Sequence, residues 1–89
     1  MRADAPTKRI RVFAPSNIDK IRKAIGMSFG DFMREMIPRA NLYGIKPSNN
    51  HVHEIVNGKR KPSPDYLALF ADTLKVKVDE FFEKRRVEI

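Results

Sequence analysis

Side chains that hydrogen-bond well are concentrated in residues 48–63, SNNHVHEIVNGKRKPS. An asparagine amide can bond adenine in a bidentate way, a glutamate can accept from the amino group of cytosine, and a histidine can donate to guanine or to phosphate. Helix positions that only face solvent usually carry residues with better helix propensity than Asn or His. The residue types in this segment therefore favour recognition of base edges in DNA, and the candidates for that role are Asn49, Asn50, His53 and Glu54.

The same segment has the pattern of one amphipathic helix over residues 48–57. Ser48 is a suitable N-cap, and Pro47 before it disfavours an earlier start. At about 100° per residue the segment has one apolar and one polar side. The apolar side holds Val52, Ile55 and Val56, and the polar side holds Asn50, His53, Glu54 and Asn57. Gly58 is predicted to end the helix.

Three consecutive cations, Lys59, Arg60 and Lys61, follow this helix. They stand where a phosphate backbone would pass a helix that lies in a DNA groove. A run of this kind is by itself weak evidence, because it also suits a solvated turn. Together with the polar helix side it predicts contacts to phosphate.

With Asn-Gly-Lys-Arg-Lys-Pro-Ser at residues 57–63 and Gly-Met-Ser at residues 26–28, the sequence resembles the Cro and phage-repressor type (XRE, lambda-repressor-like) helix-turn-helix family from about Ile18 onward. That family has an Asn-Gly-Lys/Arg pattern followed by Pro-Ser after its recognition helix, which corresponds here to residues 57–63. It also has Gly, an apolar residue and Ser or Thr before its second helix, which correspond to residues 26–28. The apolar positions shared downstream are Leu67, Phe70, Ala71, Leu74, Val76, Val78 and Phe81. The chain differs in having Phe29 where Gln is common, Val56 where an acidic residue is usual, and a longer link at residues 37–47.

The resemblance implies a sequence-specific DNA-binding transcriptional regulator, by default a repressor. It would bind an inverted-repeat operator in double-stranded DNA as a homodimer, through the helix at residues 48–57. The phosphate-binding residues expected on this basis are Ser28, Ser48, His51, Asn57, Lys59, Arg60 and Lys61. Lys8 and Arg9 are expected to add contacts from an N-terminal arm.

The whole chain predicts a mainly α-helical, compact five-helix domain at residues 16–84, between a basic arm at 1–15 and a strand-like tail at 85–89. The five helices are expected to begin at Ser16, Ser28, Ser48, Ser63 and near Val78. Pro38 is expected to end or bend the second helix. Residues 37–47 would then protrude or fold over the core, and Arg39 and Lys46 would contact phosphate if this segment reaches DNA. Tyr43 in the same segment is expected to pack.

Alternating apolar and polar residues at 8–13 and at 85–89 predict two short strands. An isolated strand leaves its backbone amides unmet, so two such strands would pair within one chain or across a dimer. Two unpaired chain ends are the alternative.

Composition limits the partners. A formal net charge of +7 and a pI near 10.1 favour an anionic partner, either nucleic acid or an anionic membrane surface. No helix combines a Lys/Arg-rich side with a large apolar one, and no stretch approaches the ~20 apolar residues of a membrane span, so no membrane partner is expected and the cytoplasm is the predicted location.

Catalysis and metal binding find little support. The chain has no cysteine, and His51 and His53 point about 200° apart on a helix, so no metal site is expected. No phosphate-binding glycine loop and no catalytic triad can be identified, so the protein is not expected to be an enzyme or to hold a cofactor. The alternatives to a regulator are an antitoxin or other protein-binding module that neutralises a partner and autoregulates through DNA, and a non-specific nucleic-acid binder.

Overall fold

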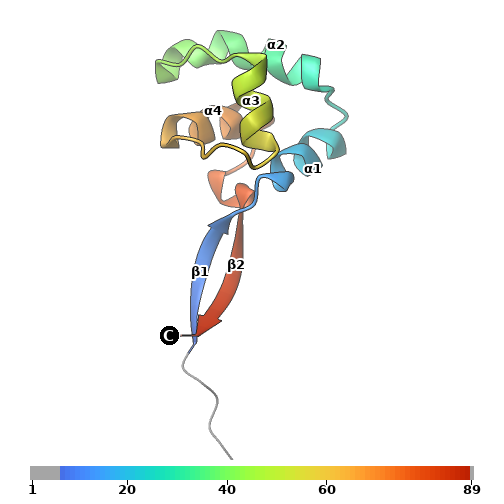
Figure 1. Cartoon of the computed structure of the whole chain (residues 1–89). Helices are drawn as coiled ribbons and strands as arrows, with labels where there is room; N and C mark the ends of the chain where they lie inside the picture. Colours follow the sequence, from blue (N-terminus) through green and yellow to red (C-terminus); the bar gives the residue numbers. More distant parts are fainter. Residues whose placement is uncertain (1–6, 89) are drawn as a thin grey trace, which may run out of the picture.

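The computed structural model describes residues 7–88, so the predicted arm residues 1–6 and the last residue, Ile89, lie outside the described residues. The elements in chain order are β1 (Thr7–Phe13), α1 (Ser16–Ala24), α2 (Phe29–Ala40), η1 (Asn41–Tyr43), α3 (Asn49–Val56), α4 (Pro64–Leu74), η2 (Val78–Phe81) and β2 (Phe82–Glu88). The helices form one body, and the two strands form a ribbon that projects from it (Figure 1).

The predicted mainly helical class is confirmed, but the count of five helices is wrong. The described residues 7–88 form four α-helices and two short 3-10 helices, η1 and η2. The segment predicted to be a fifth helix is η2, which is four residues long. The chain cannot extend it, because Phe82 is already extended and lies opposite Phe13 in the ribbon.

The second helix does not end at Pro38, so the first of the two alternatives predicted for this residue, an end or a bend, is wrong. Helix α2 includes Pro38 and continues to Ala40, where η1 follows. Proline has no backbone N–H, so α2 lacks the bond that residue 38 would otherwise donate to the carbonyl of Arg34. The chain turns away only at Gly44, which adopts a left-handed conformation with φ 66°.

Serine caps begin three of the helices as predicted. The hydroxyl oxygens of Ser28, Ser48 and Ser63 accept from the backbone N–H three residues on, at 3.0, 3.2 and 3.2 Å. Such caps satisfy amides that have no partner within the helix. Helix α1 begins at Ser16 as predicted, but the cap position is occupied by Pro15, and no side chain caps this helix.

The core lies where the four helices and η2 meet. The largest side chains with no more than 2% exposure come from all of these elements: Ile18, Phe32, Met36, Val52, Ile55, Leu69, Phe70 and Phe81. Burial of such side chains is the main favourable term in folding a domain of this size. α3 is thereby fixed against the rest of the body along its apolar side.

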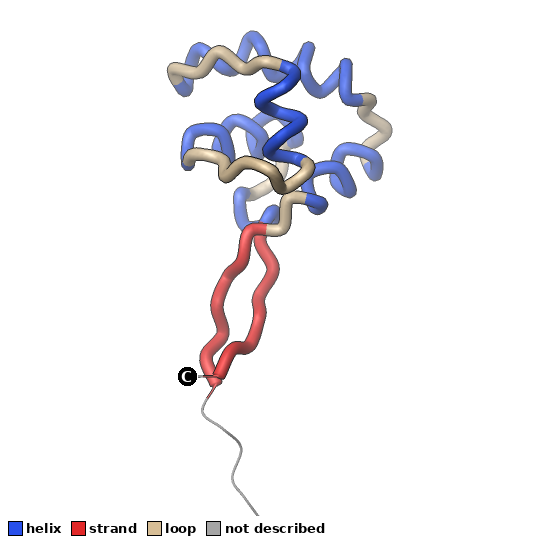
Figure 2. Tube along the Cα trace, in the orientation of Figure 1, coloured by secondary structure: helices blue, strands red, loops and turns tan. Residues whose placement is uncertain are grey.

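The ribbon consists of β1 and β2 paired antiparallel, with Thr7 opposite Glu88 and Phe13 opposite Phe82. Figure 2 shows the two strands side by side over their whole length. Pairing within one chain is therefore what the structure has, and β2 begins before the predicted boundary at residue 85. The rings of Phe13 and Phe82 meet edge to face at the base, with centroids 5.8 Å apart. The projection gives the chain extents of 58 × 27 × 22 Å.

Candidate nucleic-acid interface

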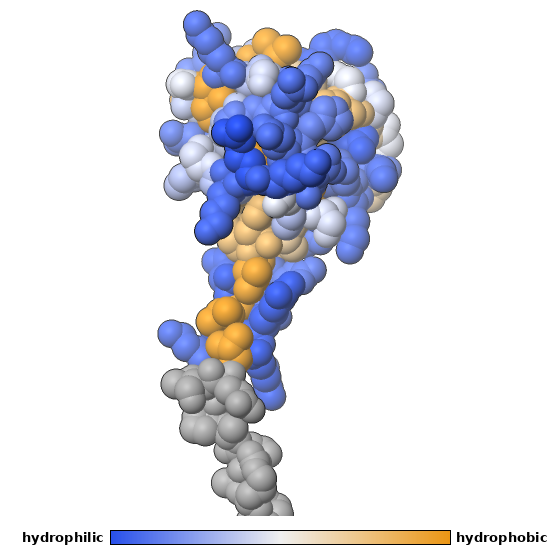
Figure 3. All heavy atoms as spheres, in the orientation of Figure 1, coloured by the Kyte–Doolittle hydropathy of each residue, from blue (hydrophilic) through white to orange (hydrophobic). Residues whose placement is uncertain are grey.

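Helix α3 presents a polar side to solvent. Its apolar residues are buried, with Val52 and Ile55 at 0% exposure and Val56 at 6%. The residues exposed on the other side are Asn49, Asn50, His53 and Asn57. Figure 3 shows hydrophilic side chains over the front of the helical body, where Figure 1 places α3. The arrangement leaves two adjacent asparagine amides at the N-terminal end of α3 open to an approaching ligand.

His53 is held by a ring stack with Phe29, the first residue of α2. The ring centroids are 3.9 Å apart and the planes differ by 15°. This contact places the N-terminus of α2, with its cap Ser28, beside the exposed side of α3. Phe29 thus has a structural role that the sequence did not reveal, because a contact between two helices leaves no local signal.

His51 makes a second stack, with Tyr66 near the start of α4. The ring centroids lie 4.7 Å apart, at 12° between planes. Burial raises the pKa of the Tyr66 hydroxyl, and the nearby charge of Arg60 acts in the opposite direction. His51 is half-buried in this position, so it is less accessible to a phosphate than the other predicted contacts.

Glu54, predicted to contact a base, and Arg60, predicted to contact phosphate, form an ion pair with each other. Arg60 Nη2 lies 3.1 Å from Glu54 Oε1, and Arg60 Nε donates to the same oxygen at 3.3 Å. Both side chains are partly exposed, so the pair is a surface one that contributes little stability. In the free protein the Glu54 carboxylate is therefore occupied by the cation that was expected to bind phosphate.

The turn after α3 is set by Gly58. The N–H of Gly58 donates to Ile55 O at 3.1 Å and that of Lys59 to Glu54 O at 2.8 Å, the pair of bonds of a Schellman C-cap. Gly58 has φ 77°, a conformation that only glycine adopts readily. The turn leaves Lys59, Arg60 and Lys61 exposed.

A cleft of about 570 Å³ lies between this turn and the base of the ribbon. Its lining includes the cations Arg11, Arg60 and Lys61 together with apolar residues such as Phe13 and Leu67. The structure therefore brings Arg11 to the basic turn, which sequence reasoning missed because it depends on strand pairing. Lys8 and Arg9, expected to contact DNA from the N-terminal arm, lie in β1, which confirms the strand predicted at residues 8–13.

The cap of α2 also carries an electrostatic feature. Hydrogen bonding to Asp31 by Ser28, first by its hydroxyl and then by its backbone, lowers the pKa of the Asp31 carboxyl below its usual value. Arg34 adds to this, with Nη1 3.1 Å from Asp31 Oδ1. The Ser28 hydroxyl accepts from Asp31 N, so it is already engaged in the cap rather than directed only to solvent.

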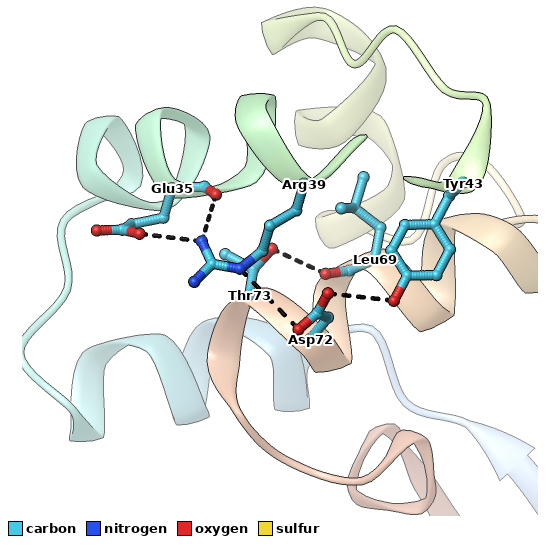
Figure 4. Close-up of polar contacts among 6 residues, drawn as sticks. All are labelled: Glu35, Arg39, Tyr43, Leu69, Asp72 and Thr73. Atoms are coloured by element: carbon cyan, nitrogen blue, oxygen red, sulfur yellow. Dashed lines mark hydrogen bonds and ion pairs between the residues drawn. The ribbon is translucent and has the colours of Figure 1, made fainter. Parts of the chain in front are cut away.

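Residues 37–47 fold over the core instead of reaching outward. Figure 4 shows Arg39 between Glu35 and Asp72, and Tyr43 directed at Asp72. Arg39 Nη1 donates to Glu35 O at 2.7 Å, Arg39 Nε lies 3.9 Å from Asp72 Oδ1, and the Tyr43 hydroxyl donates to Asp72 Oδ2 at 3.2 Å. The expectation that Tyr43 packs is confirmed. Arg39 ties α2 to α4, whereas Lys46 is exposed.

Within residues 7–88 no group of three or more His, Asp or Glu side chains is arranged to hold a metal ion. None of the helices in that range is long and apolar enough to cross a bilayer. No protein-family model, characterised protein or solved structure matches this chain.

Proposed function

We propose that the protein is a sequence-specific DNA-binding transcriptional regulator of the Cro and phage-repressor type, which acts in the cytoplasm as a repressor. Helix α3 enters the major groove, and operator occupancy blocks transcription. The observation that carries this proposal is the exposed, asparagine-rich side of a helix whose other side is fixed in the core. Such a helix fits the width of the B-DNA major groove.

The residues divide into two roles. Asn49 and Asn50 are exposed on the first turn of α3, the part of a recognition helix that contacts base edges. His53 adds a donor whose ring is oriented by Phe29. Lys59 and Lys61, exposed after the helix, hold the phosphate backbone. Glu54 can contact a base only when Arg60 leaves the Glu54 carboxylate and binds a phosphate instead.

A homodimer is part of the proposal, because one helix contacts few base pairs and two-fold dimers place two helices ~34 Å apart on the duplex. Apolar residues of the ribbon support it: Ile10, Val12 and Val87 share one face in the observed register, which also carries Lys8, Glu83 and Arg85. Val87 is 37% exposed. Figure 3 shows hydrophobic side chains along that part of the ribbon. Val87→Lys should shift the sedimenting species toward monomer, whereas Leu42→Lys, at another exposed apolar position, should not.

Base reading is tested by selecting bound sequences from a random DNA pool and then measuring variants on the selected and scrambled duplexes. Asn50→Ala should cost about 1–3 kcal/mol on the selected site and much less on scrambled DNA. Asn41→Ala, an exposed asparagine outside α3, is the matched control and should bind as the parent does. Equal losses on both duplexes would leave a non-specific binder, and no DNA binding at all would favour the antitoxin or protein-binding function.

A further inference from the structure

The β1–β2 ribbon carries most of the net charge of the chain. Its two seven-residue strands contain six Lys or Arg and two Glu, a net charge of +4 out of the +7 of the whole sequence. The helical body between them, residues 14–81, has eleven Lys or Arg against eight Asp or Glu. The excess positive charge is therefore concentrated away from the helices, on the most protruding part of the molecule.

The register sorts these charges by face. Residues directly opposite in an antiparallel pair lie on the same face, and successive residues alternate between faces. Arg9 is opposite Arg86, and Arg11 is opposite Lys84. One face of the ribbon thus holds four cations in two directly opposed pairs, with Phe13 opposite Phe82 at its base. The other face holds the remaining cations of the ribbon, Lys8 and Arg85, together with Ile10, Val12, Val87 and Glu83. We name the face with Arg9, Arg11, Lys84 and Arg86 the basic face.

Like charges directly opposite each other destabilise a strand pair. The cost is partly relieved at the base, where Arg11 pairs with Asp79 and lies 5.1 Å from the centroid of the Phe82 ring. Further out, Arg9 and Arg86 are exposed and opposed. A polyanion laid along the basic face would convert this repulsion into attraction, and a two-stranded ribbon is narrow enough to lie in the major groove of a duplex.

We propose that the basic face of the ribbon is a second, sequence-independent DNA-binding surface, which contacts phosphates through Arg9, Lys84 and Arg86. This role of the basic face rests on the proposed function only because duplex DNA is taken as the polyanion. It does not require that α3 contacts bases. The surface supplies electrostatic affinity for any duplex, and α3 supplies the choice of sequence.

The chain offers a matched pair of variants for the test. Arg9→Gln with Arg86→Gln removes two charges from the basic face, and Lys75→Gln with Lys77→Gln removes two charges from exposed positions between α4 and η2, away from the ribbon and from α3. Binding is measured to a random-sequence duplex of about three helical turns as a function of salt, in the full chain. Because each phosphate contact contributes about 0.9 to the slope of log affinity against log salt, the first variant should lower the slope by about 1.8. The affinity advantage of the parent protein should then shrink about tenfold between 50 and 200 mM salt.

The Lys75 and Lys77 variant should change the slope much less. Hydrogen exchange gives a second readout: duplex should slow exchange of the ribbon amides in the parent protein and not in the Arg9 and Arg86 variant. Equal slope changes in the two variants would overturn the basic face as a site. So would a basic-face variant that binds DNA normally and self-associates, because the cations would then serve to keep a strand edge from aggregating. Loss of binding to phosphatidylserine vesicles with duplex binding unchanged would also overturn it, in favour of a membrane surface.

Failure here can be told apart from failure of the proposed function. If Asn50→Ala loses affinity on the selected site and the basic-face variant has the slope of its control, base reading stands and the second surface falls. If the basic-face variant has the lower slope and Asn50→Ala has no effect on any duplex, the second surface stands and the sequence-specific function falls.

Discussion

The imidazole of His53 stacks on the ring of Phe29, with centroids 3.9 Å apart and planes 15° from parallel. The stack joins the exposed side of α3 to the first residue of α2. His53 is exposed, yet its ring has a fixed orientation before any ligand arrives. A donor that is already oriented loses less conformational entropy on binding, so this contact favours a role for His53 in recognition.

The stack predicts a measurable coupling between the two rings. In a double-mutant cycle with Phe29→Leu and His53→Ala, the coupling free energy in urea unfolding should be about 0.5–1.5 kcal/mol. Phe82→Leu combined with His53→Ala is the control, since Phe82 packs at the base of the ribbon, and that pair should be additive. Additive effects for Phe29 and His53 would mean that the rings do not stack in solution.

The ion pair between Glu54 and Arg60 predicts a gain in DNA affinity when the charge of Glu54 is removed. Glu54→Gln frees Arg60 and removes a negative charge from the proposed interface, so binding to scrambled duplex should strengthen and the salt slope should rise by up to about 0.9. Glu80→Gln makes the same change in net charge at an exposed position in η2. A similar gain in both variants would assign the effect to net charge alone.

Local signals made part of this structure predictable. The caps at Ser28, Ser48 and Ser63 depend on a side chain and a backbone amide three residues apart, so the sequence contains both partners. The burial of Val52 and Ile55 follows from their spacing in α3. The polar side of α3 was predictable for the same reason, since it is what the apolar side leaves to solvent.

The features that could not be predicted depend on contacts between distant residues. Helix α2 continues past Pro38 where Arg39 is held by Glu35 and by Asp72, and Asp72 lies more than thirty residues further on. The pattern near Val78 suits a short helix, but pairing of β2 with β1 fixes the chain as extended from Phe82. The candidate site also depends on contacts between distant residues. The residue pattern of a single segment indicates neither the two ring stacks nor the position of Arg11 beside the basic turn.

Substitution of Gly58 is predicted to weaken DNA binding by more than its effect on stability explains. Gly58→Ala and Gly26→Ala each place a Cβ at positive φ, 77° and 75°, and should each cost about 1–2 kcal/mol in unfolding free energy. The new Cβ at residue 58 would meet Pro15 Cγ at 3.4 Å, an ordinary contact distance, and the one at residue 26 would meet nothing within 4 Å. The stability losses should therefore be similar.

DNA binding should distinguish the two glycine variants. Gly58 sets the direction of the turn that holds Lys59 and Lys61, so Gly58→Ala should also weaken binding to duplex under conditions where both variants are fully folded. Gly26→Ala should bind as the parent protein does. A loss of the same size in both would show that binding follows stability and not the course of this turn.

Alkaline pH should weaken the contact between Tyr43 and Asp72. Burial raises the pKa of the Tyr43 hydroxyl above its ordinary value of 10.0, and the hydrogen bond to Asp72 and its negative charge add to the shift. The folded state thus holds this proton more tightly than the unfolded state does. The stabilisation is fully present below pH 10 and is lost as the pH rises through the folded-state pKa.

Urea unfolding measured from pH 8 to pH 11 checks this sign. The unfolding free energy of the parent protein should fall above about pH 10, and Tyr43→Phe, which cannot ionise, should fall less steeply. Asp72→Asn removes the carboxylate but leaves Tyr43 in place, so its decline should lie between the two, because burial still raises the pKa of Tyr43. The parent protein and Tyr43→Phe differ in no other ionisable group, so their comparison isolates the tyrosine. Parallel curves for the parent protein and Tyr43→Phe would mean that the hydroxyl is solvated in solution, and that residues 37–47 are not held against α4 by this bond.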